Sequence, residues 1–531
     1  MMSRTTLALI LGVTLGAPAT AAAQNVYLFP ETYYGFGSDT AFAIPLGGTR
    51  KAFLYGSVSG GVSSYSITVF FDTTRLRIVR ADSVPGYGLP SPTVTPIVNG
   101  AMLSATGTGA SGSAYLATLE LEMRSTATAG SLMSLRVNQW LTQAGGTVVT
   151  NDLRTDLLNT CLARVLWGDP DSSLTVTGRD ALIALTSAVG LPVTGFDLTV
   201  ADVDDDLAVT SRDALLMLSY AVGGYSYYYY YERTGLPKAG ACAPLAGVPS
   251  AMVFIRDDAS NGILYQVAAG DSVAAAIGST TQFGDASQQF ARWSPDGTRV
   301  LATAYTASYY YEPIAVNVGT LAQDTLAKNL AFYDGWGTYA PDGRIAFFSD
   351  RTPPGTCTGA SGLCYLWMMG GDGSNPVWLQ STTTVTNYTS TNPAWSPDGQ
   401  RVAFTGYQTC CTNGLWSVRV DSGTVRVEYP TASGYSPLHP HWSPAGDSLA
   451  FQSGGRIFVV AAPDTATAPR EAVSLSASLD LSGWTAAGIL FRRRQSPSSP
   501  ATYDYYVQQP DGRIVKIYRA AGTQDVGASF R

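Results

Sequence analysis

The stretch Ala201–Leu218 reads ADVDDDLAVTSRDALLML and places acids at alternating positions before an apolar run. Asp202, Asp204 and Asp206 alternate, and Asp213 lies where the apolar run begins. Alternating side chains on a curled loop can aim several carboxylate oxygens at one point, which is how a twelve-residue calcium loop holds its ion. The stretch therefore predicts a Ca²⁺ site followed by a helix that positions the last ligand.

The pattern occurs twice. Gly168–Leu185 reads GDPDSSLTVTGRDALIAL, and aligning Asp169 with Asp202 also aligns the two Arg-Asp-Ala-Leu segments. Two aligned copies argue against a chance acidic turn, although a degenerate pair that folds without metal is the alternative. The oxygen ligands expected at loop positions 1, 3, 5, 7, 9 and 12 are Asp169, Asp171, Ser173, Thr175 (carbonyl), Thr177 and Asp180 in the first copy, and Asp202, Asp204, Asp206, Ala208 (carbonyl), Thr210 and Asp213 in the second.

Residues 160–224 resemble the type I dockerin module, whose duplicated loop–helix reads GDVNGDGxVNSxDALxLLxYxxG. The resemblance implies calcium-dependent docking onto a cohesin domain. It also implies that loop positions 10 and 11 face the partner, which are here Gly178, Arg179, Ser211 and Arg212. One departure concerns loop position 6, where a glycine is usual because the turn favours positive φ. Leu174 and Leu207 stand there, at an expected cost of about 1 kcal/mol each.

The C-terminal half repeats a turn motif. WSPDG occurs at Trp293–Gly297 and Trp395–Gly399, with the variants YAPDG at Tyr339–Gly343 and WSPAG at Trp442–Gly446. Each copy precedes a short apolar strand, and a worn copy begins at Trp484. A period of roughly 45 residues with short strands is typical of a β-propeller. Residues 249–531 resemble the TolB-like propeller family.

The two ends of this half predict how the ring closes. Met252–Val267 looks like the later strands of a blade, and the C-terminal VGASFR looks like an opening strand. Joined, they complete a ring of six blades, and seven is the alternative. His439 and His441 stand beside a repeat aromatic, which favours a packing role over metal binding.

Residues 24–155 read as short strands with Gly-rich turns. Leu54–Val84 and Ala114–Val137 each alternate apolar and polar residues on either side of a turn, which predicts a β-sandwich. The pattern FFDTTRLRIV at 70–79, followed by LATLELEM, resembles cohesin modules and their carbohydrate-binding relatives. Another immunoglobulin-like sandwich is the alternative.

The first 23 residues predict a signal peptide. Arg4 precedes the short apolar run Leu7–Leu15, and Ala21–Ala23 supplies small residues for cleavage before Gln24. We therefore expect an exported protein, extracellular or periplasmic, with no membrane span; an uncleaved anchor is the alternative. A net charge of −7 without a basic run argues against a nucleic-acid partner.

The six cysteines suit an oxidising compartment. Cys161 and Cys242 bracket the acidic repeats, and the dockerin resemblance, in which the module ends lie close together, implies a disulfide between them. A second bridge is expected between Cys357 and Cys364, whereas the adjacent Cys410 and Cys411 are ambiguous. Residues 225–248 form a linker with the tyrosine run 227–231, read as a strand on the propeller or as a stacking ladder.

Together these patterns predict a mainly β, multidomain chain: a β-sandwich, a small α-helical dockerin with paired calcium loops, and a six-bladed propeller. The predicted function is a secreted, calcium-binding interaction protein. Its expected partner is a cohesin-like domain of another protein, or of a second copy of this chain, and polysaccharide is a further candidate ligand. The alternative is a secreted glycosidase or lyase with catalysis on the propeller. Glu312, Glu428 and Glu471 lie in no recognisable motif for that chemistry.

Overall fold

A computed structural model describes most of the chain. The described residues are 25–30, 42–57, 62–110, 114–142, 148–149, 157–204, 206–223, 234–238, 240, 246–258, 261–277, 291–305, 311–326, 334–351, 365–380, 385–387, 392–408, 412–430, 435–462, 469–473, 479–494, 503–519 and 524–531. The predicted signal peptide and the tyrosine run 227–231 lie outside them, as do Cys242, Cys357, Cys364, Cys410 and Cys411. None of the described helices has the length and apolar character needed to cross a bilayer.

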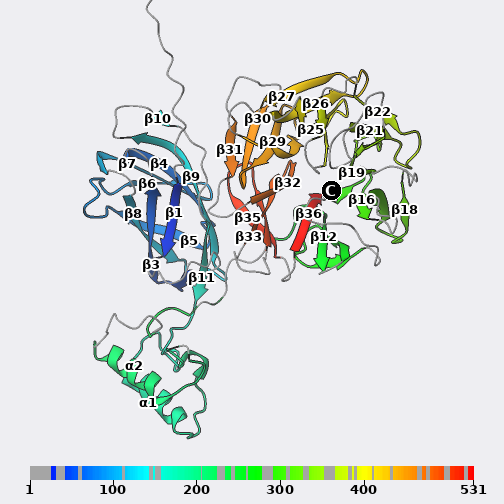
Figure 1. The fold of residues 1–531 in the computed structure, drawn as a ribbon. Helices are drawn as coiled ribbons and strands as arrows, with labels where there is room; N and C mark the ends of the chain where they lie inside the picture. The colour runs from blue at the N-terminus through cyan, green and yellow to red at the C-terminus, as the bar shows by residue number, and fades with distance from the viewer. Residues whose placement is uncertain are drawn as a thin grey trace, which may run out of the picture.

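Two stacked sheets form the N-terminal sandwich (Figure 1). The first sheet has the order β1 (Asn25–Pro30), β3 (Thr49–Ser57), β8 (Ala114–Met123) and β5 (Leu76–Asp82). The second has the order β2 (Phe42–Pro45), β11 (Leu157–Ala163), β9 (Ser131–Thr142), β4 (Val62–Phe70), β7 (Gly100–Ala110) and β6 (Thr93–Ile97), with β10 (Val148–Val149) beside β9. Alternate residues such as Leu54, Ile67 and Leu119 fill one core between the sheets.

The sandwich extends further along the chain than expected. Strand β11 pairs antiparallel with β9 and parallel with β2, so the domain ends at Ala163 and the predicted end at residue 155 is too early. The segment LLNTCLA lacks a turn signal and buries most of its side chains, which suits an inner strand. Cys161 lies in this strand and is disulfide-bonded, whereas its predicted partner Cys242 is outside the described residues.

The loop–helix module (residues 166–223) follows the sandwich. It contains α1 (Gly178–Ala188), the 3₁₀ turn η1 (Leu198–Val200) and α2 (Ser211–Ala221). Both helices bury a small-residue stripe against each other, with Ala184, Val203 and Met217 at the centre of a compact core. Residues 234–238 and 240 then run back beside residues 162–167, because Trp167 N donates to Leu236 O and Gly240 N donates to Leu162 O. In its described part, therefore, the predicted linker lies on the start of this module at residues 234–238 and 240, and on the propeller half at residues 246–248, where Ala246 N donates to Lys516 O and Val248 is buried.

Antiparallel sheets surround a common centre in the propeller half, residues 249–531 (Figure 1). In chain order, the first sheet is β15 (Arg292–Trp293), β16 (Arg299–Tyr305), β17 (Tyr311–Asn317) and β18 (Gln323–Thr325), and the next is β19 (Asp334–Tyr339), β20 (Ile345–Ser349), β21 (Tyr365–Met369) and β22 (Val377–Trp378). The following sheet has β23 (Val385–Asn387) and β24 (Ala394–Trp395) beside β25 (Arg401–Gln408), then β26 (Thr412–Arg419) and β27 (Val425–Pro430), and it is followed by the sheet of β28 (Leu438–Trp442), β29 (Ser448–Ser453), β30 (Arg456–Ala461) and β31 (Arg470–Val473). Two further sheets are β32 (Leu479–Thr485), β33 (Gly488–Arg494), β34 (Tyr503–Gln508) and β35 (Ile514–Arg519), and the sheet that joins both ends of this half, β14 (Ala274–Ala276), β13 (Asn261–Val267), β12 (Met252–Asp258) and β36 (Gln524–Phe530).

The ends of this half meet as expected. Strand β36 pairs antiparallel with β12, with Met252 opposite Phe530, so that the C-terminal strand completes a sheet begun at the start of the half. Repeat aromatics join neighbouring sheets: Trp395 Nε1 donates to Thr338 O, and Trp442 Nε1 donates to Ala394 O, each at 3.1 Å. These two hydrogen bonds tie the sheet of β25 to the sheet of β19, and the sheet of β28 to the sheet of β25.

In the WSPDG-type turns, residues of the same turn donate hydrogen bonds to the turn's aspartate. In the first copy Ser294 Oγ donates to Asp296 Oδ1 at 2.6 Å, and Thr298 N donates to the same oxygen at 3.0 Å. These hydrogen bonds, that from Ser294 first, lower the pKa of Asp296 to about 2. In the WSPAG copy, which lacks the aspartate of the triplet, Ser443 donates instead to Asp447, the residue after the glycine.

Candidate metal centre

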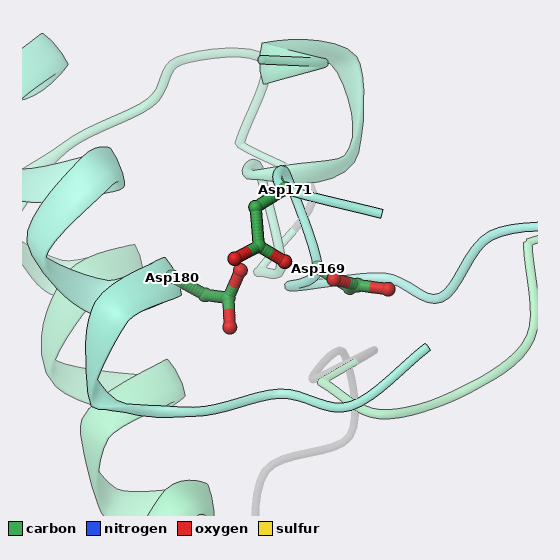
Figure 2. A group of neighbouring side chains, drawn as sticks. All are labelled: Asp169, Asp171 and Asp180. Carbon is green, nitrogen blue, oxygen red and sulfur yellow. The ribbon is translucent and has the colours of Figure 1, made fainter. Parts of the chain in front are cut away.

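The first loop (Asp169–Asp180) brings three carboxylates together. One oxygen each of Asp169, Asp171 and Asp180 lies within 4.8 Å of the others. Figure 2 shows Asp180 at the start of α1 facing Asp171 on the loop, with Asp169 beside them. The loop closes because Ser173 N and Leu174 N donate to Asp169 at 2.9 and 2.7 Å. Loop positions 1, 3 and 12 of the sequence pattern therefore converge.

Asp180 has one oxygen occupied and one left over. Thr177 caps α1, and its backbone N and Oγ1 donate to Asp180 Oδ2 at 2.9 and 2.8 Å, forming a capping box. The other oxygen, Oδ1, is buried and has no hydrogen-bond partner among the described residues. Leaving a buried carboxylate oxygen unsatisfied is costly, so this donor set fits a hard cation such as Ca²⁺.

The second loop (Asp202–Asp213) groups a different set. Oxygens of Asp202, Asp204 and Asp206 lie within 4.8 Å of one another. Asp213 instead turns toward backbone: its Oδ1 accepts from Val203 N at 2.8 Å, and its Oδ2 accepts from Thr210 N at 2.8 Å. The position-12 acid of this loop thus holds the loop and the helix start, while three other acids converge.

Both loops adopt the strained turn that the pattern requires. Leu174 has φ 64° and Leu207 has φ 71°, the left-handed conformation expected for loop position 6. Asp202 accepts from Asp206 N and Leu207 N at 3.2 and 3.1 Å, as Asp169 does in the first loop. The two copies therefore share a backbone path despite their different acids.

The remaining predicted ligands lie in the loops but have protein partners. The Thr175 carbonyl accepts from Ser173 Oγ at 3.0 Å. The hydroxyls of Thr177 and Thr210 serve as helix caps in both copies. Ala208 N donates to Asp206 Oδ1 at 2.9 Å, at the turn from which its carbonyl is expected to reach an ion.

Burial and mutual repulsion disturb the loop carboxylates. Burial raises the pKa of Asp169, and burial together with the charges of Asp213 and Asp206 raises the pKa of Asp204. Burial also acts on Asp171, but hydrogen bonds from Ser173 and Asp169 and the charge of Arg179 outweigh it and lower the pKa of Asp171. Clustered acids with raised pKa values are poorly compensated by the protein alone, which again fits a bound cation.

The predicted partner residues begin the two helices. Gly178 and Ser211 are the first residues of α1 and α2, and Arg179 and Arg212 follow them. Each arginine bends back to an acid of its own loop. Arg179 Nη1 lies 3.3 Å from Asp171 Oδ2, and Arg212 Nε lies 3.2 Å from Asp204 Oδ2.

A second duplicated feature of the helices escaped the sequence reasoning. Both helices expose large apolar side chains at matched positions 33 residues apart. These are Leu182, Leu185 and Val189 after the first loop, and Leu215, Leu218 and Val222 after the second. The signal was present in the alignment of the two copies, which pairs each of these residues with its counterpart.

His439 and His441 lie on β28, next to the repeat Trp442. Their side chains are half-buried, and neither belongs to a group of three metal-binding side chains among the described residues. Burial lowers the pKa of His439 to about 4 and also lowers the pKa of His441. Both histidines are therefore neutral at pH 7.

Two propeller acids, Glu312 and Asp334, lie close enough for the charge of Asp334 to act on Glu312. Burial raises the pKa of both, and the charge of Asp334 raises the pKa of Glu312 further. Both side chains are buried, and Arg351 Nη2 donates to Asp334 at 2.6 Å. Asp334 is thus both buried and ion-paired, and Glu312 is buried beside it.

No protein-family model and no curated protein matches the sequence. Solved structures that align with this chain include TolB from Acinetobacter baumannii (10% identity, covering 76% of this chain and 79% of that one, TM-score 0.40). They also include a gluconolactonase from Xanthomonas campestris (13% identity, 54% and 90%, TM-score 0.34) and the seventh ScaB type I cohesin from Pseudobacteroides cellulosolvens (12% identity, 26% and 92%, TM-score 0.21). Structural neighbours of this mainly β, multidomain chain thus include TolB-like propellers and cohesin domains, at low similarity.

Proposed function

We propose that the chain is a secreted multi-module interaction protein. Its loop–helix module binds Ca²⁺ in both loops and docks onto a cohesin-like domain, and its six-bladed propeller serves as a binding platform. The observation that carries the proposal is the buried Asp180 Oδ1, which has no hydrogen-bond partner within the described part of the chain and belongs to a residue of a three-acid cluster. Each loop leads directly into a capped helix, so that metal binding in the loop stabilises the helix that faces the partner.

The exposed apolar stripes support a protein partner for this module. Isolated exposed leucines are common on soluble proteins, but two equivalent stripes on adjacent helices form a repeated patch. The duplication offers two similar docking faces, so loss of one face should be tolerated and loss of both should not. A cohesin-like domain of another chain is the proposed partner, and the sandwich of a second copy is the alternative source of such a domain.

Titration calorimetry on the mature full-length chain tests the calcium proposal. After EDTA treatment and dialysis, Ca²⁺ should bind with measurable heat, and Asp202→Ala should remove the contribution of the second loop. Absence of heat at millimolar Ca²⁺ would defeat the proposal. Asp324→Ala, a propeller acid outside both loops, is the matched control and should leave the heat unchanged.

Binding measurements on the same chain test the docking face. Leu182→Asp and Leu215→Asp should each retain calcium-dependent capture of a cohesin-like domain, while the double variant should lose it. Sedimentation velocity with calcium and with EDTA separates pairing between copies from binding to another chain. Equal capture by the double variant and the wild type would refute the helix-face model.

Polysaccharide is a second proposed ligand, favoured by aromatic rings on the sandwich. Tyr55 and Tyr115 lie on the outer face of the first sheet with ring centroids 5.2 Å apart, and Phe53 and Tyr27 extend the group. Half-buried rings on a sheet face can stack on sugar rings. Retention on insoluble polysaccharides should survive EDTA and fall with Tyr115→Ala. Insensitivity to that change would exclude this face as the sugar site.

A further inference from the structure

The two arginines at loop position 11 make the same contact in both copies of the module. Arg179 Nη1 lies 3.3 Å from Asp171 Oδ2, and Arg212 Nε lies 3.2 Å from Asp204 Oδ2. The two acids occupy loop position 3, where the calcium pattern places a ligand. Repetition of one contact at equivalent residues indicates that it belongs to the loop design and is not a chance surface pair.

The contact joins a buried carboxylate to an exposed guanidinium group. The side chains of Asp171 and Asp204 are only 7% and 5% exposed, whereas those of Arg179 and Arg212 are 68% and 60% exposed. In the second loop the contact is purely ionic, because neither carboxylate oxygen of Asp204 has a hydrogen-bond partner among the described residues. An exposed guanidinium in such a pair is held weakly and can leave without disturbing the loop backbone.

A guanidinium and a calcium ion compete for the same acid. An ion at the centre of the loop would carry two positive charges and would use the position-3 oxygen as a ligand. Like charges at contact distance repel strongly, so the arginine and the ion cannot both occupy this place. Resting on the proposed calcium function, we propose that Arg179 and Arg212 are built-in counter-ions of the metal-free loops, which Ca²⁺ displaces and releases toward the docking partner.

This exchange would couple metal binding to docking. The released guanidinium groups lie on the first turns of α1 and α2, next to the apolar stripes that begin at Leu182 and Leu215. A carboxylate on the partner could then accept two hydrogen bonds from the planar guanidinium group of either arginine. By linkage, a partner that holds the arginine away from its loop must raise the calcium affinity of that loop.

Calcium titration of arginine variants tests the counter-ion role. In the full-length chain, Arg179→Met/Arg212→Met should bind Ca²⁺ roughly two- to tenfold more tightly than the wild type, because the competing charge is gone. Arg179→Lys/Arg212→Lys keeps the charge and should stay closer to the wild type. Arg164→Met removes an exposed arginine outside the loops and should change nothing.

The outcomes separate this inference from the function on which it rests. A wild-type chain that gives no calcium heat overturns the calcium function and the inference with it. Calcium heat with equal affinity in the wild type and the double methionine variant overturns the inference alone.

Chemical labelling provides a test without any substitution. Phenylglyoxal modifies accessible guanidinium groups, and peptide mass spectrometry reports each arginine separately. Addition of calcium should raise the labelling rate of Arg179 and Arg212 while that of Arg164 stays constant. Unchanged or slower labelling of both loop arginines in calcium would show that the ion does not displace them.

Discussion

Aspartate is the repeated residue in two regions of the chain, and it behaves differently in each. In the propeller turns Asp296 accepts hydrogen bonds from Ser294 and Thr298, and its pKa falls to about 2. In the loops Asp180 keeps a buried oxygen that no described residue hydrogen-bonds, and burial raises the pKa of Asp169. The contrast teaches that a repeated acid is structural when the chain saturates its oxygens, and points to a ligand when it does not.

Calcium should separate the two regions most strongly. At a concentration a thousandfold above Kd, a ligand that binds only the folded state adds about 4 kcal/mol to the free energy of unfolding. Asp180→Ala should remove the gain that calcium gives to the first loop, because it deletes a ligand and half of a capping box. Asp296→Ala, in a propeller turn, should leave the calcium gain intact. Calorimetric melting with calcium and with EDTA measures both, and loss of the gain in Asp296→Ala would break the comparison.

Acid should weaken the propeller through its histidines before its aspartates. The chain holds two histidines, and the folded pKa of His439 is about 4 against about 6.5 when unfolded. Between these values the unfolded state binds more protons, so the free energy of unfolding falls as the pH drops through this window, by at most about 3 kcal/mol for His439. Asp296, with a folded pKa of about 2, adds its own loss only below about pH 4.

Denaturant unfolding at pH 7, 5.5 and 4.5 checks this sign. His439→Gln/His441→Gln should flatten the dependence between pH 6.5 and 4, after allowance for any loss at pH 7. A wild-type propeller equally stable at pH 7 and 4.5 would contradict the assignment.

Removal of a saturated turn acid should have a modest cost. Asp296→Asn and Asp398→Asn each weaken the hydrogen bond from a serine hydroxyl and should cost about 1 kcal/mol, since the turns are exposed. Ala445→Asp restores the usual triplet in the WSPAG copy, but Ser443 already donates to Asp447. That change should therefore alter stability by less than about 0.5 kcal/mol, as most surface changes do. A clear gain from Ala445→Asp in chemical denaturation would show that Asp447 is a poor substitute.

Glycine at loop position 6 should give the smallest effect. Leu207→Gly relieves the left-handed strain and should stabilise the metal-free module by up to about 1 kcal/mol. Leu174→Gly should gain less, because Leu174 is 52% exposed whereas Leu207 is 90% exposed and loses little packing. Thermal melting in EDTA ranks the two variants, and the opposite rank would contradict the strain argument.

Local patterns were sufficient for some of these features. The left-handed turns at Leu174 and Leu207 and the pairing of β36 with β12 follow from loop position and repeat phase. The inclusion of β11 in the sandwich depends on its pairing with the distant strands β2 and β9, and the sequence of β11 alone does not indicate these partners.

The partners of individual side chains in the loops and turns depended on competition between alternative local hydrogen bonds, which the sequence does not resolve. Asp213 Oδ1 accepts a hydrogen bond from Val203 N, whereas Asp180 Oδ1 has no partner among the residues that the structure describes, although the two acids align in the repeat. Arg179 and Arg212 likewise contact acids of their own loops, a side-chain placement that the sequence pattern leaves open. Asp447 replaces the missing triplet acid from a neighbouring position that the motif does not include.

The pairing of β36 with β12 also sets an order of events during synthesis. Strand β12 ends at Asp258, and its inner neighbour begins only at Gln524. The first sheet of the propeller half must therefore wait, with its inner edge unpaired, until the ribosome has made almost the whole remaining chain. During that interval the inner edge of β12 has no partner strand within its own sheet, so this half of the chain cannot close. Closure of the propeller half therefore depends on a strand made near the end of its synthesis, and the β12–β36 pairing must be among the last contacts of this half to form.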